Sequence, residues 1–162
     1  MKKLIYLLIF TIAVSGCGYT NINIVKIDEP IIKSKKFVSS FEDTWGVLLK
    51  FITASGGAIK LTDKDSGIIS FERFLNWQEV NKYAIIPRGV SLVSPSQVAK
   101  INFLLTRSEN NIIELTISAK VSGSGKTWGA MTQYVYDIEL KSTGVLEKEY
   151  IEQLQNILPV KK

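Results

Sequence analysis

The chain has 162 residues, with 20 Lys and Arg against 15 Asp and Glu, 46% hydrophobic residues, one Cys and no His. This length fits one domain, and the composition is that of a globular protein, which excludes intrinsic disorder for most of the chain. The lack of His excludes His-based catalytic triads and His-containing zinc sites, and a single Cys excludes an internal disulfide.

The amino-terminal residues have the pattern of a secretory signal. Lys2 and Lys3 give a positive start, and the apolar run over 4–14 is much shorter than the ~20 residues that a membrane-spanning helix needs. The run leads into Val14-Ser15-Gly16-Cys17, which resembles the bacterial lipobox. That resemblance implies cleavage after Gly16 and attachment of acyl chains to Cys17.

Two or three acyl chains would anchor the protein stably to a membrane. The alternative is an ordinary signal peptide with an incidental Cys, but the use of the only Cys at this place favours lipidation. In similar lipoproteins of two-membrane bacteria, an Asp after the Cys favours the inner membrane. Gly18 follows here, so we expect the outer membrane, facing the periplasm, or the outer face of the cytoplasmic membrane in a one-membrane cell.

These features divide the chain into three parts. We expect a signal peptide over 1–16, a lipidated Cys and tether with a possible edge strand over 17–36, and a single α+β domain over 37–162. The basic run over 33–36 is interpreted as a solvated linker near an anionic membrane surface. We therefore expect no nucleic-acid partner.

The first half of the domain predicts a helix and a hairpin. Ser39 and Glu42 have capping-box spacing, and apolar residues then recur on one helical face, which predicts a helix over 40–55. Strand-forming residues over 58–62 and 68–75 flank a polar turn and predict a hairpin. The following residues contain Pro and Gly and predict a long ordered loop with one short strand, over 76–96.

The second half predicts a three-stranded meander and a helix. Apolar and polar residues alternate over 99–106, 113–121 and 132–141, with a Gly/Ser-rich loop over 122–126. An apolar stripe then predicts a helix over 145–158. The fold class expected is α+β, with an antiparallel sheet of about five strands covered on one face by two helices, which is a helix-grip-like two-layer sandwich.

Two motifs suggest ligand chemistry but fail in detail. Gly125-Lys126-Thr127 matches the end of a phosphate-binding loop, yet Lys120 stands where a Gly is required and a strand follows instead of a helix. The turn over 63–67 resembles the start of a calcium loop, but Phe74 stands where the bidentate Glu belongs. We expect no nucleotide, metal or cofactor.

Catalytic pairs are equally weak. Glu72 with Glu79, and Asp137 with Glu139, are the carboxylate pairs available for acid–base chemistry, and solvated surface positions explain them better. No spacing selects a Ser/Lys pair or a strained turn around one Ser. We therefore expect that the protein is not an enzyme.

The aromatic residues divide by position. Trp45 lies on the apolar stripe of the first helix and is expected in the core, and Tyr134 and Tyr136 are expected to point inward. Trp77 and Trp128 fall in or beside loops, so each either anchors a partner or caps the open end of the core. These two are the candidate partner-binding residues.

The domain resembles the helix-grip domains of small bacterial envelope lipoproteins, of the kind found in the C subunit of the outer-membrane β-barrel assembly machine. The resemblance lies in the helix over 39–55, in Asp65-Ser66-Gly67-Ile68-Ile69, and in Ser142-Thr143-Gly144-Val145-Leu146-Glu147. It implies a helix-grip fold and a place in an envelope complex.

Two functions follow from the sequence. The first is a membrane-anchored, non-catalytic adaptor or accessory subunit that holds another envelope protein. The alternative is a tethered periplasmic module that binds a lipid or another apolar ligand between the helices and the sheet. The adaptor is favoured because the apolar stripes of the helices are narrow enough to be filled by the sheet.

Overall fold

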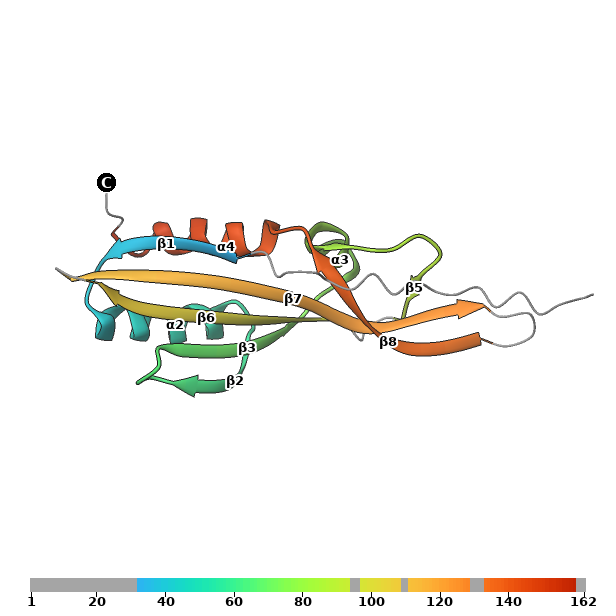
Figure 1. The fold of residues 1–162 in the computed structure, drawn as a ribbon, viewed down its shortest axis with the longest axis horizontal. Helices are drawn as coiled ribbons and strands as arrows, with labels where there is room; N and C mark the ends of the chain where they lie inside the picture. The colour runs from blue at the N-terminus through green and yellow to red at the C-terminus, as the bar shows by residue number, and fades with distance from the viewer. Residues whose placement is uncertain (1–31, 94–96, 109–110, 129–132, 160–162) are drawn as a thin grey trace, which may run out of the picture.

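One long strand organises the sheet. The computed structural model describes residues 32–93, 97–108, 111–128 and 133–159. Within them, β7 (Ile112–Trp128) pairs along one edge with β6 (Val98–Ser108) and then β5 (Ser91–Leu92). Its other edge pairs with β1 (Ile32–Val38) and then β8 (Gln133–Ser142). Both edges of β7 are therefore covered along most of its length (Figure 1).

The remaining strands extend the sheet outward. On one side β3 (Ile68–Phe74) pairs with β6, and β2 (Ala58–Asp63) pairs with β3 as an edge strand. On the other side β4 (Ala84–Ile85) pairs with the end of β8. All pairs are antiparallel, and the described residues form an eight-stranded sheet.

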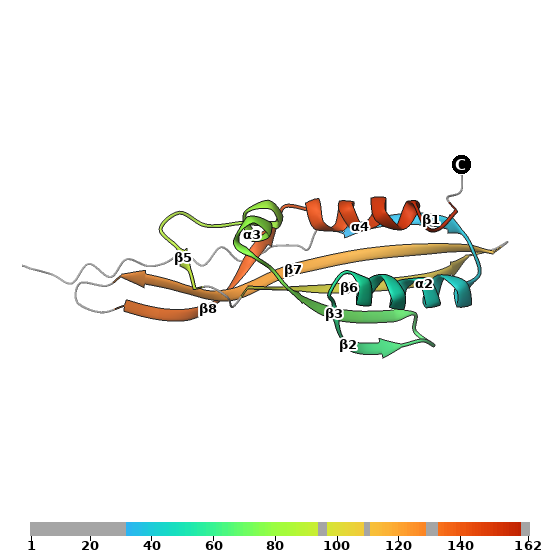
Figure 2. The same ribbon diagram turned by 180° about the vertical axis from the view of Figure 1, so that it is seen from behind.

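Three helices of the described region lie on one face of this sheet, as the two opposite views show (Figures 1 and 2). They are α2 (Phe41–Ala54), α3 (Trp77–Tyr83) and α4 (Val145–Gln155). The α+β class and the large antiparallel sheet are confirmed. The prediction of about five strands and two helices is wrong in number, because β1, the short strands β4 and β5 and the helix α3 enlarge both layers. Among the described residues, none of the helices combines the length and the hydrophobicity that a membrane span requires.

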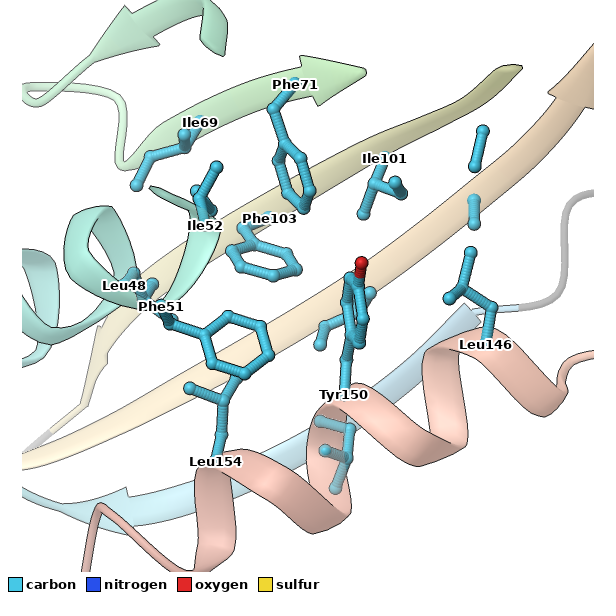
Figure 3. Close-up of a cluster of buried hydrophobic side chains, with 14 of the residues drawn as sticks. Leu48, Phe51, Ile52, Ile69, Phe71, Ile101, Phe103, Leu146, Tyr150 and Leu154 are labelled. Carbon is cyan, nitrogen blue, oxygen red and sulfur yellow. The ribbon is translucent and has the colours of Figure 1, made fainter. Parts of the chain in front are cut away.

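Strand periodicity places the core between the helices and the sheet. Along β6 and β7 alternate residues are buried, and their neighbours face the open side. At the centre, the rings of Phe51, Phe71, Phe103 and Tyr150 contact one another with centroids 5.1–6.4 Å apart. Figure 3 shows these side chains filling the space between α2, α4 and the sheet. Trp45 is buried, as expected.

Three further features of the structure differ from the predictions made from the sequence. The residues over 122–126, expected as a loop, lie inside β7, where Gly125 passes beneath the ring of Tyr136 and an added Cβ would meet that ring at 3.2 Å. The basic run over 33–36, expected as a linker, lies in β1, so this strand begins ahead of the expected domain boundary at 37. Tyr134, expected to point into the core, is exposed.

Candidate functional site

The structure describes some of the site residues predicted from the sequence and not others. Gly16 and Cys17 lie outside the described residues. Trp128 is the last residue of β7, where its backbone pairs with Gln133, and its side chain is also outside the described part. Trp77 is the first residue of α3 and its side chain is 52% exposed. The structure does not bring the two Trp positions together, because α3 lies beside the base of the β7–β8 hairpin and Trp128 at its far end (Figure 1).

A second large apolar side chain lies close to Trp77 in the sequence. Phe74, the last residue of β3, is 76% exposed. Beside it is a shallow hollow of about 540 Å³ lined by Phe74, Leu75, Asn76 and Glu79. We call Phe74, Trp77 and this hollow the corner surface. Sequence reasoning missed Phe74, although its odd spacing from the inward Phe71 places it on the opposite face of the strand.

A capping box fixes the corner. The backbone N–H of Glu79 donates to the side-chain oxygen of Asn76 at 2.9 Å, and the backbone N–H of Asn76 donates to the carboxylate of Glu79 at 2.9 Å. This reciprocal pair starts a short helix immediately after β3. The helix in turn sets the position of Trp77.

Polar contacts then fasten the corner to the rest of the fold. Nη2 of Arg73 lies 3.0 Å from Oε1 of Glu79, and its guanidinium lies 5.8 Å from the centre of the Tyr83 ring. The Tyr83 hydroxyl donates to Glu149 on α4 at 2.8 Å, and Nζ of Lys82 lies 2.5 Å from the other oxygen of that carboxylate. These partly buried contacts join β3, α3 and α4.

The protonation states in this cluster suit a fastening role. Burial and the hydrogen bond to Glu149 raise the pKa of Tyr83, so its hydroxyl stays protonated. Burial alone would raise the pKa of Glu149, but the bonds from Lys82 and Tyr83 outweigh it and lower this pKa. The bond to Glu149 likewise raises the pKa of Lys82. All three groups are held in their ordinary states near neutral pH, and none is activated as a base or a nucleophile.

A second buried polar cluster lies at the start of α4. Glu147 is fully buried and accepts from Ser142, and the backbone N–H of Gly144 donates to the Ser142 hydroxyl at 3.0 Å. Glu147 also bonds to the backbone at Ala119. This part of β7 lies between its last pairing with β1, at Ser118, and its first pairing with β8. The Glu147 carboxylate thus bonds to β7 at the point where neither β1 nor β8 pairs with this edge of the strand.

Three of the candidate carboxylates, Glu72, Asp137 and Glu139, lie on the uncovered face of the sheet. Glu72 pairs with Lys60 at 3.1 Å and Glu79 pairs with Arg73, so the structure does not join Glu72 to Glu79. Asp137 and Glu139 are both exposed on this face, where they line an open hollow of about 440 Å³. Within the described residues, no group of three His, Cys, Asp or Glu side chains could hold a metal ion.

The corner surface is thus the site with exposed apolar anchors on a fixed frame. Comparison with known proteins adds no assignment, since no family model, no curated protein and no solved structure matches the chain. A function for this chain therefore rests on its own residues and their geometry.

Proposed function

We propose that this protein is a lipid-anchored, non-catalytic adaptor of the bacterial cell envelope, and that its corner surface holds another envelope protein. Acyl chains on Cys17 would attach it to the membrane, on the periplasmic face of the outer membrane if the cell has two membranes. The resemblance to helix-grip lipoproteins suggests an assembly or secretion complex as the partner.

One observation carries the binding part of the proposal. Phe74 and Trp77 are 76% and 52% exposed on a corner that a capping box and the Arg73–Glu79 ion pair hold in place. Aromatic side chains of this size are frequent anchors at interfaces, and a fixed frame lowers the entropic cost of binding. Solvent exposure of two such side chains is unfavourable in isolation, and a partner that covers them would remove that cost.

The alternative of an apolar ligand between the helices and the sheet is less favoured. The aromatic cluster of Phe51, Phe71, Phe103 and Tyr150 occupies that space, with Phe103 fully buried. The hollows described above open instead on the uncovered face and at the corner. A ligand in the core would have to displace packed rings, which costs several kcal/mol, on the order of a large-to-small core substitution.

The test is co-purification from native membranes. The chain carries a carboxyl-terminal tag, membranes are solubilised in mild detergent, and captured proteins are identified by mass spectrometry. We expect one reproducible envelope protein, which is lost with the double variant Phe74→Ala, Trp77→Ala and also with Cys17→Ala. Recovery of the protein as a free monomer would contradict the proposal.

A matched variant separates binding from folding. Leu61 on β2 is 53% exposed and lies opposite Ser70, four residues before Phe74 along β3. Leu61→Ala removes a comparable exposed apolar side chain and should leave capture unchanged. The double corner variant should keep the melting temperature of the wild type within a few degrees, since surface substitutions usually change stability by about 0.5 kcal/mol or less. A large fall would mean that these rings stabilise the fold instead.

A further inference from the structure

The outer edge of β8 differs from the outer edges of β1 and β2. From Gln133 to Leu140 this strand pairs only with β7 among the described strands, because β4 pairs with its last two residues. The β7–β8 pairing runs in unbroken register over this stretch, so the edge carries no bulge. In Figures 1 and 2 these two strands continue beyond the helices as an arm.

The outer edges of β1 and β2, which are also free among the described strands, carry features that discourage strand addition. β1 contains Lys33, Lys35 and Lys36, and its last residue donates a backbone hydrogen bond to Pro159 at 2.8 Å. β2 contains Lys60 at a register shift, which bends the edge. Charged lysines and bulges are the usual means by which sheet edges avoid pairing with other chains.

The edge of β8 over 133–140 has none of these features. The stretch contains no Lys, no Pro and no register shift. Its outward N–H and C=O groups, which pair with no described strand, form a template for an additional strand. The edges of β1 and β2 carry lysines or a register shift and the edge of β8 carries neither. This contrast indicates that the edge of β8 is available for pairing with another strand.

The side chains of β8 indicate which strand would fit. On the face toward the helices lie Tyr134, Tyr136 and Ile138, and on the open face lie Val135, Asp137 and Glu139. Val135 is 62% exposed, and Asp137 has no ion pair with any described residue. Within the described part of the chain, the one ion pair of Glu139 is a distant one with Lys120, at 3.8 Å. An added strand would therefore meet apolar groups on one face and acidic groups on the other.

We propose that the outer edge of β8 over 133–140 binds an extended segment of a partner protein as an added β-strand, and that this segment alternates basic with apolar residues. The basic side chains lie beside Asp137 and Glu139, and the apolar ones continue the face of Tyr134 and Tyr136. A second copy of this chain fits poorly, because two β8 strands would bring acidic open faces together. The inference is independent of the corner surface and of the lipid anchor.

The test uses the full-length protein in detergent and a labelled seven-residue peptide of alternating Lys and Val. Binding is followed by fluorescence anisotropy, and hydrogen exchange reports which amides become protected. We expect the outward amides over 133–140, which exchange fast in the free protein, to slow when the peptide is added. We expect Asp137→Lys to weaken binding by about fivefold or more, as reversal of one exposed charge pair predicts.

Controls assign the binding to this edge. Asp65→Lys makes the same charge change on the exposed β2–β3 turn and should leave peptide affinity unchanged. A peptide with Glu in place of Lys, and one whose amide nitrogens are methylated, should both fail to bind. Equal binding of either control peptide, or protection of β1 or β2 instead of β8, would overturn the proposal.

Two further measurements test strand addition at β8 and its independence from the corner surface. Slow exchange of every amide over 133–140 in the free protein would mean that the chain itself or a second copy already fills the edge, and would overturn the proposal. The Phe74→Ala, Trp77→Ala variant should bind the peptide as the wild type does. Capture of the envelope protein therefore tests only the corner surface, and peptide binding tests only the edge of β8, so either proposal can fail while the other stands.

Discussion

The hydroxyl of Ser142 lies 3.2 and 3.3 Å from the two carboxylate oxygens of Glu147, and both side chains are buried. Ser142 ends β8 and Glu147 lies in the first turn of α4, so this contact fixes the turn between the last strand and the last helix. Lys33 on β1 provides a weaker electrostatic contribution, and Ala119 on β7 provides a backbone bond. One carboxylate thereby links β7, β8 and α4.

Glu147 should make stability depend on pH in an unusual direction. Burial raises its pKa above the ordinary 4.5, against the hydrogen bonds that lower it. Between the unfolded value and the raised folded value, the folded state binds more protons than the unfolded state, so this group's contribution is largest below about pH 4.5 and declines as the pH rises through that window. We expect Glu147→Gln to remove this decline, measured as the wild-type minus variant difference in melting temperature across pH 4 to 8. A difference that does not change with pH would contradict the assignment.

Removal of the carboxylate group altogether should be costly. Glu147→Ala leaves the buried Ser142 hydroxyl and the backbone at Ala119 without this partner. We expect a loss of about 1–3 kcal/mol in the free energy of unfolding, which is the usual cost of an unpaired buried polar group. Urea denaturation measures it, and a loss near zero would mean that water replaces the side chain.

Gly67 should tolerate no larger residue. It has a φ of +71°, and an added Cβ would lie 2.2 Å from the carbonyl oxygen of Leu105. Gly67→Ala should cost at least about 1–2 kcal/mol for the left-handed conformation alone. Gly46 in α2 is the matched control, since nothing lies within 4 Å of an added Cβ there. Gly46→Ala should stabilise the protein by about 0.5–1 kcal/mol, and equal effects at both positions in urea denaturation would be inconsistent with the structure.

Phe103 should carry much of the core energy. It is fully buried and its ring contacts those of Phe51, Phe71 and Tyr150. Phe103→Ala should lower the free energy of unfolding by about 3–5 kcal/mol. Its neighbour Leu104, 41% exposed on the open face, provides the control, and Leu104→Ala should change stability by about 0.5 kcal/mol or less. A larger loss of stability for Leu104→Ala than for Phe103→Ala would contradict the assignment of Phe103 to the buried face of β6 and Leu104 to the open face.

The cap of α2 distinguishes two adjacent serines. The sequence spacing predicts Ser39 as the cap, whereas the structure has Ser40, whose hydroxyl accepts from the backbone N–H of Asp43 at 3.1 Å. Ser40→Ala should cost about 1 kcal/mol. Ser39→Ala should cost clearly less in the same thermal denaturation experiment, and the opposite result would restore the assignment from the spacing.

Alternation predicted the strands that are buried on one face and exposed on the other, as in β6 and the first part of β7. It failed where glycine replaces a side chain, since Gly123 and Gly125 suggest a loop by composition but lie in a strand. There a close neighbour such as Tyr136 requires the missing Cβ. The signal for α3 was present in the spacing of Asn76 and Glu79, but the surrounding Pro and Gly residues favoured a loop.

The candidate site was predicted only in part. Trp77 was recognised from its place beside a loop, and Phe74 was not, because a Phe at the end of an apolar strand is usually core. Its exposure depends on β3 ending where α3 begins, which is a tertiary feature. The basic residues of β1 were interpreted as a solvated linker near an anionic membrane surface, yet an edge strand accommodates them.

Crosslinking in living cells tests the central claim most directly. A photoreactive phenylalanine analogue is placed at position 74, at position 77, or at the control position 61 on β2, and intact cells are irradiated. We predict one crosslinked envelope protein from positions 74 and 77, absent from position 61 and lost when Cys17 is replaced by Ala. Crosslinks from position 61 alone, or none at either corner position, would contradict a membrane-anchored adaptor that binds through this corner.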